Sequence, residues 1–197
     1  MSAMVSRLTM LLVVMCVLVA WADKRGPVGT GPAASPRALA AFDTVRRVLQ
    51  HPRCQNCHPA GDAPLQGDDS HVHTQNVRRG TDGRGQLGEQ CTTCHGLANP
   101  PKVYGAHVPP GSEEGWRMPS EDVKLVFVGM SPRALCGQLK DFHRNGGKDM
   151  AALRAHLNTP LVRWGWSPGF GRKPVSIPRA GFLAAWESWA RAGAPCP

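Results

Sequence analysis

Cys54-Gln55-Asn56-Cys57-His58 and Cys91-Thr92-Thr93-Cys94-His95 are two copies of the pattern C-x-x-C-H in a chain of 197 residues. This pattern is the attachment site of c-type haem, because two thiols a turn apart add to the vinyl groups of one porphyrin and the adjoining imidazole ligates the iron. The sequence therefore predicts two covalently attached haem c groups. Their covalent links would come from Cys54, Cys57, Cys91 and Cys94, and their proximal iron ligands would be His58 and His95.

A C-x-x-C pair also occurs in zinc sites and in thioredoxin-like dithiols. A zinc site built from these two copies would leave both histidines without a role, whereas haem attachment uses every residue of both motifs. Haem attachment is therefore the interpretation that we carry forward, with structural zinc as its alternative.

The first 22 residues have the organisation of a secretory signal peptide. Arg7 precedes an apolar run from Leu8 to Val19, and Ala20-Trp21-Ala22 supplies a cleavage signature. The run is shorter than the ~20 residues that a membrane-spanning helix needs. Cys16 suggests a lipoprotein, but Met15 before it is too large for that signal. We expect a cleaved signal, a periplasmic protein and no stable membrane span.

The chain is basic, with 23 Lys and Arg residues against 14 Asp and Glu residues and a formal net charge of +9. Loss of Arg7 with the signal would lower this charge to +8. The propionates of two haems would offset up to about four of these charges. A basic surface suits an acidic redox partner protein, and nucleic acid is not an expected partner because the chain has no recognition motif for it.

Seven cysteines are present in the whole sequence. When the one in the signal and the four in the haem motifs are set aside, Cys136 and Cys196 remain. In an oxidising periplasm we expect these two to form a disulfide bond, with two buried thiols as the alternative. Closing a loop of that length would stabilise the fold by about 4 kcal/mol in the chain-entropy model.

Residues 23–35 are rich in Gly, Pro and Ala and predict a flexible leader. Ser35 and Pro36 then start a helix that ends before His51-Pro52. Three further helices are predicted from Ser131 to about His143, from Asp149 to Asn158 and from about Arg179 to Ala192.

The two motifs stand only 37 residues apart, and residues 59–90 between them show no amphipathic helix. This leaves no room for two tandem haem domains. No alternating strand pattern is evident either. The fold class expected is mainly α: a single compact dihaem cytochrome c-like domain over residues 36–197, with long ordered loops. The aromatic loop around Trp164-Gly165-Trp166 would either wall a haem or plug the core, and the core role is favoured.

The ligand on the second face of each iron decides its potential and whether a substrate can bind. Four distal candidates stand in the sequence: His73, Met118, His51 and His156. Met118 lies in a Met-Pro loop and is equally explained as a gap-filling core residue. His73 lies in an extended segment between the motifs, with a solvated loop histidine as its alternative. His51 and His156 are also readily explained as capping or packed residues.

The chain resembles the small c-type cytochrome subunits that accompany molybdenum hydroxylases of the isoquinoline 1-oxidoreductase type. The resemblance runs from about Phe42 to the C-terminus. Besides the second haem motif, it rests on His51-Pro52-Arg53-Cys54, His58-Pro59-Ala60-Gly61-Asp62, Arg144-Asn145-Gly146-Gly147, Arg163-Trp164-Gly165-Trp166-Ser167-Pro168-Gly169 and Gly193-Ala194-Pro195-Cys196-Pro197. It implies electron acceptance from a molybdenum and iron-sulfur enzyme that oxidises an N-heterocycle or an aldehyde, and delivery to the respiratory chain.

One segment departs from the pattern expected for these subunits. Where Trp-x-Leu/Ala-Pro is expected, this chain has Trp116-Arg117-Met118-Pro119. The departure moves weight from Met118 toward His73, His51 and His156, which lie in segments that match.

We therefore expect a periplasmic electron-transfer subunit of an oxidoreductase system that is not itself an enzyme. The alternative is a dihaem peroxidase-like enzyme with one open haem iron, although such enzymes are usually longer and have two separate haem domains. Two six-coordinate irons with at least one His/His pair would distinguish the carrier from the peroxidase.

Overall fold

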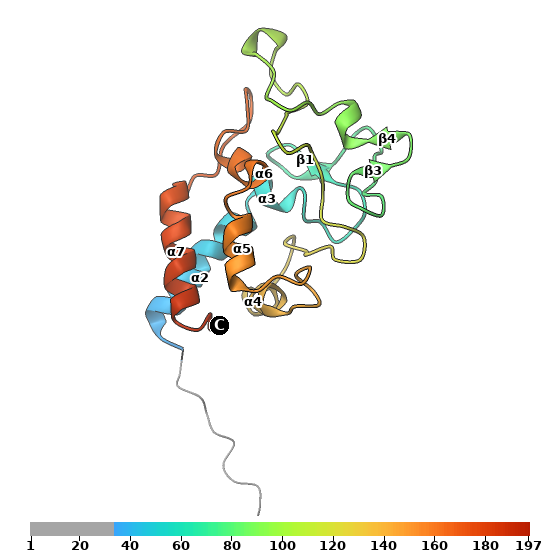
Figure 1. The fold of residues 1–197 in the computed structure, drawn as a ribbon. Helices are drawn as coiled ribbons and strands as arrows, with labels where there is room; N and C mark the ends of the chain where they lie inside the picture. Colours follow the sequence, from blue (N-terminus) through green and yellow to red (C-terminus); the bar gives the residue numbers. More distant parts are fainter. Residues whose placement is uncertain (1–33) are drawn as a thin grey trace, which may run out of the picture. The chain divides into compact units, whose positions relative to one another are not determined.

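Two antiparallel helices pack against each other more extensively than any other pair of elements in residues 34–197. α2 (Pro36–Leu49) packs along α7 (Arg179–Arg191) in the computed structural model, which describes residues 34–197 (Figure 1). Ser35 caps α2 by accepting a hydrogen bond from the amide of Ala38, and Pro36 takes the first helical position, as predicted. The signal peptide expected for residues 1–22 and most of the leader lie outside the described residues.

The core lies where α2, α7 and α4 (Pro132–Lys140) meet. Phe42 of α2 and Trp189 of α7 are fully buried with their ring centroids 5.0 Å apart. Large aromatic side chains contribute much of the apolar area that a small domain buries. A disulfide bond between Cys136 of α4 and Cys196 then holds the C-terminal tail on this core, as predicted.

The remaining elements are short. α3 (Pro52–Gln55) is a single turn that includes the first cysteine of the first motif. α5 (Met150–His156) and α6 (Pro160–Arg163) are short helices that follow each other in the chain. Three 3-10 turns are η1 (Cys91–Thr93), η2 (Lys102–Tyr104) and η3 (Trp164–Trp166). Two antiparallel hairpins pair β1 (Leu65–Gln66) with β2 (His71–Val72), and β3 (Gly85–Gln86) with β4 (Glu89–Gln90).

The mainly helical fold and all four predicted helices are confirmed for residues 34–197. The helix expected to reach about His143 ends earlier, at Lys140, because Asp141 takes an extended conformation. The buried amide of Asn145 then donates to the carbonyls of Leu139 and Lys148 and fixes the turn that follows. The two hairpins, α3 and α6 were not predicted.

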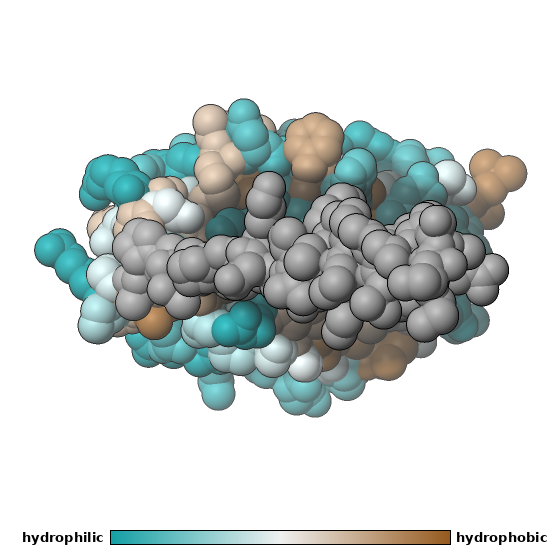
Figure 2. All heavy atoms as spheres, turned by 90° about the horizontal axis from the view of Figure 1, so that it is seen from below, coloured by the Kyte–Doolittle hydropathy of each residue, from teal (hydrophilic) through white to brown (hydrophobic). Residues whose placement is uncertain are grey.

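One face of the described residues is largely polar where it is visible (Figure 2). In the view from below, hydrophilic residues make up most of the coloured surface, and hydrophobic residues appear as separate spots around it (Figure 2). Every helix within residues 34–197 is too short or too polar to cross a membrane.

Candidate functional site

The first motif forms a helical turn that gathers its three functional side chains. The amide of Cys57 donates to the carbonyl of Cys54 at 3.3 Å, and the amide of His58 donates to the carbonyl of Gln55 at 3.0 Å. Residues three and four apart share one face of such a turn. Cys54, Cys57 and His58 accordingly line one cavity.

The second motif also forms a turn, a 3-10 turn where the first motif begins in the α-helix α3. η1 begins at Cys91, whose carbonyl accepts from the amides of Cys94 at 3.3 Å and His95 at 2.9 Å. The two thiols and the imidazole again stand at positions one, four and five of a turn. Both C-x-x-C-H segments therefore form a turn closed by a hydrogen bond from the amide of the second cysteine to the carbonyl of the first, although their neighbouring sequences differ.

Each motif histidine is held by one hydrogen bond to a backbone carbonyl. Nδ1 of His58 donates to the carbonyl of Leu125, and Nδ1 of His95 donates to the carbonyl of Pro110, both at 2.7 Å. A carbonyl only accepts, so Nδ1 carries the proton and Nε2 keeps its lone pair. This is the arrangement by which proteins orient a histidine that binds a metal.

Burial keeps both of these imidazoles neutral. It lowers the pKa of His58 to about 3, and it also lowers the pKa of His95. An aromatic ring stacks on each: Phe127 on His58 at 3.9 Å between centroids, and Trp116 on His95 at 4.8 Å. Hydrogen bond and stacked ring together fix the direction of each Nε2.

A cavity of about 610 Å³ opens in front of His58. This volume falls in the range of small-molecule and cofactor sites. Apolar side chains from four helices and the loops between them form much of its wall: Val48, Leu49, Leu139, Leu153, Phe182 and Trp186 among others. A large apolar group would contact many of these side chains here.

Two of the four distal candidates lie on the wall of this cavity. His156 reaches it from α5, and Met118 reaches it from the loop after the second motif. His156 lies near enough to His58 that a charge on it would lower the pKa of His58 further. Burial lowers the pKa of His156 itself, so its lone pair is also available. Met118 is buried, with 5% of its surface exposed.

A third distal candidate faces the second motif. The ring centroids of His73 and His95 lie 6.3 Å apart. An imidazole nitrogen binds a transition metal at about 2 Å, so a metal between two opposed imidazoles separates their centroids by about 6 Å. Burial lowers the pKa of His73, and its Nδ1 is buried without a hydrogen-bond partner.

The neighbouring His71 has a different environment. Its ring is exposed, and Nδ1 pairs with Asp69 at 2.6 Å while Nε2 contacts the amide of Gln66 at 3.0 Å. His71 and His73 therefore have different environments, although they stand two residues apart.

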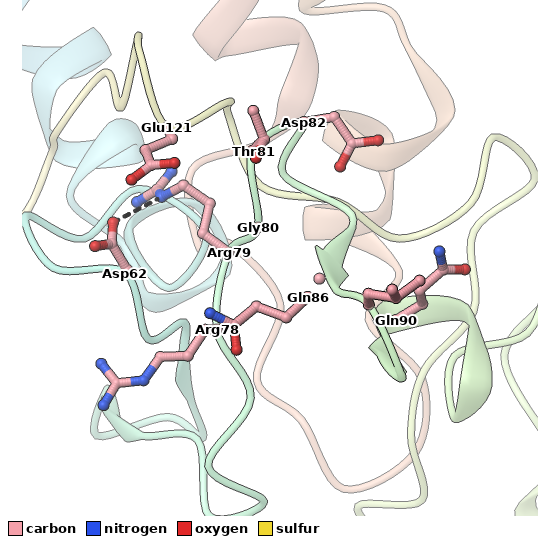
Figure 3. A pocket seen from close by; sticks show the side chains of 11 residues that line it. Asp62, Arg78, Arg79, Gly80, Thr81, Asp82, Gln86, Gln90 and Glu121 are labelled. Carbon is pink, nitrogen blue, oxygen red and sulfur yellow. Dashed lines mark ion pairs between the residues drawn. The ribbon is translucent and has the colours of Figure 1, made fainter.

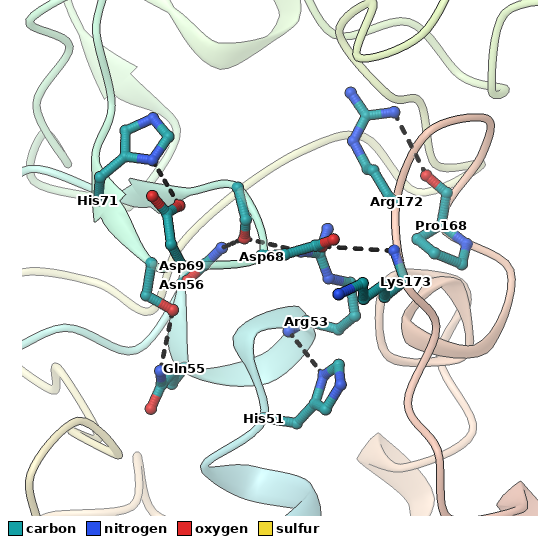
Figure 4. Close-up of polar contacts among 12 residues, drawn as sticks. His51, Arg53, Gln55, Asn56, Asp68, Asp69, His71, Pro168, Arg172 and Lys173 are labelled. Atoms are coloured by element: carbon teal, nitrogen blue, oxygen red, sulfur yellow. Dashed lines mark hydrogen bonds and ion pairs between the residues drawn. The ribbon is translucent and has the colours of Figure 1, made fainter.

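His51, the fourth distal candidate, is the N-cap of α3. Its Nδ1 accepts a hydrogen bond from the amide of Arg53 at 3.1 Å (Figure 4). It is absent from the lining of the cavity in front of His58. Its geometry is that of a helix cap.

The motif thiols differ from those of redox-active dithiols. Burial raises the pKa of Cys54 to about 12 and that of Cys57 to about 11, whereas a reactive dithiol has a lowered thiol pKa. Cys57 also lies near Cys91, since a charge on Cys91 would raise the pKa of Cys57 further. Within residues 34–197 no three His, Cys, Asp or Glu side chains form a group that could hold a metal ion by themselves.

Sequence reasoning missed a buried arginine between the motifs. The side chain of Arg79 is only 1% exposed and forms an ion pair with Asp62 on the edge of a polar cavity of about 590 Å³ (Figure 3). Its guanidinium donates to the carbonyls of Pro119 at 2.7 Å and Gly61 at 2.9 Å. It thus ties the chain after His58 to the loop that carries Met118. No feature of the sequence distinguishes Arg79 from its neighbour Arg78 as the buried residue.

A second buried arginine precedes the first motif cysteine. Arg53 donates to the carbonyl of Gly67 at 2.7 Å and pairs with Asp68 (Figure 4). Its guanidinium carbon also lies 5.8 Å from the centroid of the Trp164 ring. Arg53 therefore joins the first motif, the β1–β2 hairpin and the aromatic loop.

The aromatic loop combines both roles considered for it. Trp164 and Trp166 line the cavity in front of His58. Trp166 also stacks on the core residue Phe182 at 5.5 Å, whereas Trp164 meets Trp116 edge-on at 4.7 Å. Trp166 thus belongs to core and wall together, and Trp164 connects the surroundings of the two motifs.

Comparison with known proteins adds no relative: no family model, no curated protein and no solved structure matches this chain.

Proposed function

We propose that this protein is a periplasmic dihaem c-type cytochrome that transfers electrons between protein partners and is not itself an enzyme. The observation that carries the proposal is the repeated geometry of the two motifs. In both, two thiols and a neutral imidazole share one face of a turn, and a carbonyl at 2.7 Å fixes the imidazole proton on Nδ1. This is what covalent haem attachment with proximal histidine ligation requires.

The residues present fit haem c at both motifs. At the first, Cys54, Cys57 and His58 border a cavity of cofactor size with many apolar side chains in its wall, and His156, which also lines this cavity, would be the distal ligand. At the second, the ring centroids of His73 and His95 lie 6.3 Å apart, a spacing that suits two ligands of one metal, and the buried Nδ1 of His73 has no hydrogen-bond partner. Met118 is the competing ligand at the first motif.

When bound, haem iron supplies reversible one-electron oxidation and reduction. His58 with His156 or Met118, and His95 with His73, are the residues that would hold a haem iron on both faces, and a site closed in this way would need no exchange of ligand when the oxidation state changes. Phe127 and Trp116 fix the planes of the proximal imidazoles, and the apolar wall keeps water away. The nearness of Cys57 to Cys91 brings the two attachment points together, which shortens the path between the two redox centres.

The compartment and the partner belong to the same proposal. The disulfide between Cys136 and Cys196 fits an oxidising compartment, where c-type haem is attached. The resemblance to subunits of molybdenum hydroxylases suggests such a dehydrogenase as the electron donor and a respiratory-chain component as the acceptor.

The test is haem content. Protein exported in a host with a cytochrome c assembly system should carry two haems that survive acid extraction, as measured by mass spectrometry. Cys54→Ala with Cys57→Ala should remove one haem, and Cys91→Ala with Cys94→Ala should remove the other. The matched control is Cys136→Ala with Cys196→Ala, which should keep both.

A chain with no haem, or one that carries zinc instead, contradicts the proposal. Low-temperature electron paramagnetic resonance of the ferric protein should show two low-spin signals. A high-spin signal together with rapid peroxide turnover would assign the chain to the peroxidase-like alternative.

A further inference from the structure

Two surface loops beside the second motif expose large apolar side chains. The first loop, residues 96–108, includes η2, and the second, residues 168–173, follows the aromatic loop; both lie at the top of Figure 1. The exposed fractions are 86% for Val103, 70% for Tyr104, 65% for Leu97 and 47% for Phe170. We call the surface formed by these four residues with Lys102 and Lys173 the exchange surface.

The two loops are fixed to each other. The amide of His107 donates to the carbonyl of Phe170 at 3.4 Å, and the guanidinium of Arg172 donates to the carbonyl of Val108 at 2.5 Å. Nζ of Lys102 lies 5.8 Å from the centroid of the Phe170 ring. The exchange surface is therefore preformed, and a partner would pay little conformational entropy to use it.

The exchange surface is connected directly to the second motif. Leu97 follows His95 by two residues, and the Nδ1 partner of His95 is the carbonyl of Pro110, two residues after the first loop. Asn99 in that loop accepts from Nε1 of Trp164 at 3.0 Å, and Trp164 meets Trp116, the ring stacked on His95.

The second motif also lies closer to solvent than the first. Cys94 is exposed, whereas Cys91 and both cysteines of the first motif are partly buried, and Cys54 and Cys57 line the cavity in front of His58. The second motif is therefore the one through which electrons can enter or leave the protein, with the first motif behind it.

The charges of the exchange surface have one sign. Residues 96–112 contain Lys102 and no Asp or Glu, and residues 168–175 contain Arg172 and Lys173 and no Asp or Glu. The acid in contact with these loops is Asp68, which accepts from the amide of Lys173 but is already paired with Arg53 (Figure 4). An apolar centre with a cationic rim matches a partner with an acidic rim, because opposite charges steer the encounter and the apolar centre holds the complex.

We propose that an acidic one-electron redox protein docks on the exchange surface and exchanges electrons with the haem at the second motif. The proposal rests on the proposed function. In the reducing direction, one electron passes from the reduced centre of the partner, which becomes oxidised, to the ferric iron held by His95, which becomes ferrous. No covalent bond forms or breaks.

The test uses the full, haem-loaded protein with reduced plant-type ferredoxin as an acidic one-electron donor, in stopped-flow experiments at low and high salt. Lys102→Glu with Lys173→Glu should lower the second-order rate constant about tenfold at low salt, and less at high salt. The matched control is Arg37→Glu with Arg133→Glu, which makes the same change of net charge at exposed positions elsewhere. It should change the rate constant by less than about threefold.

A binding measurement separates docking from electron transfer. Val103→Ser with Tyr104→Ser should reduce the line broadening that oxidised ferredoxin causes in nuclear magnetic resonance spectra, at both salt concentrations. Haem content and low-spin spectra should stay those of the unsubstituted protein.

Three results overturn the proposal. Equal slowing by the two charge-reversal pairs would assign the effect to net charge. Loss of haem in the Val103 and Tyr104 variant would show that these side chains cover the cofactor and do not meet a partner. Unchanged rates and binding with both haems intact would refute the docking site alone, whereas a chain without haem refutes the proposed function and the exchange surface together.

Discussion

At the scale of single residues, His71 and His73 give the sharpest comparison. The His73 ring faces His95 at 6.3 Å between centroids, whereas His71 is exposed and paired with Asp69. If His73 is a distal ligand, His73→Ala leaves one iron with five ligands. We expect one of the two low-spin signals to become high-spin in electron paramagnetic resonance. His71→Ala is the matched control and should leave both signals unchanged, so an equal effect of the two substitutions would remove His73 from the ligand set.

If haem is bound at the first motif, His156 and Met118 are the two candidates for its distal ligand. Both line the cavity with His58, but only an imidazole gives a His/His pair, and methionine ligation raises the reduction potential relative to histidine. We expect His156→Ala to turn the first haem high-spin and Met118→Ala to leave it low-spin.

A sulfur-to-iron absorption band in the near infrared of the ferric protein would reverse this assignment. The band should then vanish in Met118→Ala and persist in His156→Ala.

At the scale of elements, the loop that carries Met118 depends on a close backbone approach. The amide of Met118 donates to the carbonyl of Gly83 at 2.8 Å, and a Cβ on Gly83 would stand 2.1 Å from the Met118 carbonyl oxygen. Gly83 has a φ of +80°; Gly88 has a φ of +89° but open space around its Cα. Substituting Gly83 and Gly88 separately distinguishes the cost of steric overlap, which arises only at Gly83, from the cost of backbone strain, which arises at both.

Gly88→Ala should lower the free energy of unfolding by about 1–2 kcal/mol, the cost of a left-handed conformation for alanine. Gly83→Ala should lower it by a further 1–3 kcal/mol or so, because the loop has to move. Chemical denaturation of the haem-loaded protein measures both. Equal losses would mean that the loop adapts without cost.

The elements that the sequence predicted are those with local signals. Ser35-Pro36 and Ser131-Pro132 mark helix starts because a hydroxyl cap and a proline at the first position act within one turn. α3 and α6 have four residues each and the paired strands two each, which is too short for any periodicity to show.

The same distinction holds for the site. The C-x-x-C-H pattern forms its own turn, so the placement of His58 and His95 beside the motif cysteines follows from the sequence, whereas their role as proximal ligands stays a prediction. The environments of His71 and His73 differ because only His73 lies beside the ring of His95, and Arg79 is buried where two loops distant in sequence supply carbonyls to it. Contacts of this kind leave no mark in a single sequence.

At the scale of the whole molecule, the C-terminal tail closes the core. Cys196 is joined to Cys136 of α4 across a separation of 60 residues. Nζ of Lys140 donates to the carbonyl of Ala194, and Nε1 of Trp189 donates to the carbonyl of Pro195, both at 2.9 Å. The tail thereby links α4 to α7, and α7 packs on α2, which leads into the first motif.

The disulfide should be the largest single contribution of the tail to stability. Removing a cross-link that closes a loop of this size raises the entropy of the unfolded chain and so lowers the free energy of unfolding by about 4 kcal/mol in the chain-entropy model. Cys136→Ala with Cys196→Ala should therefore lower the free energy of unfolding by about that amount in guanidinium chloride. A phosphine reductant should have a similar effect on the unsubstituted protein, because it opens a disulfide but leaves the thioether bonds of covalent haem intact.

The reductant should leave the free energy of unfolding of the double variant unchanged, because this variant has no Cys136–Cys196 disulfide to open. The variant is therefore the control for other effects of the reductant. Thiol labelling of the denatured, unreduced protein should find neither Cys136 nor Cys196 free. A loss below about 1 kcal/mol would mean that the hydrogen bonds of Lys140 and Trp189 hold the tail by themselves. α7 packs on α2, and α2 leads into the first motif. In the Cys136→Ala, Cys196→Ala variant, the low-spin spectrum of the haem at the first motif should therefore be lost at a lower denaturant concentration than that of the haem at the second motif. A simultaneous loss of both low-spin spectra would instead show that the two sites unfold as one unit.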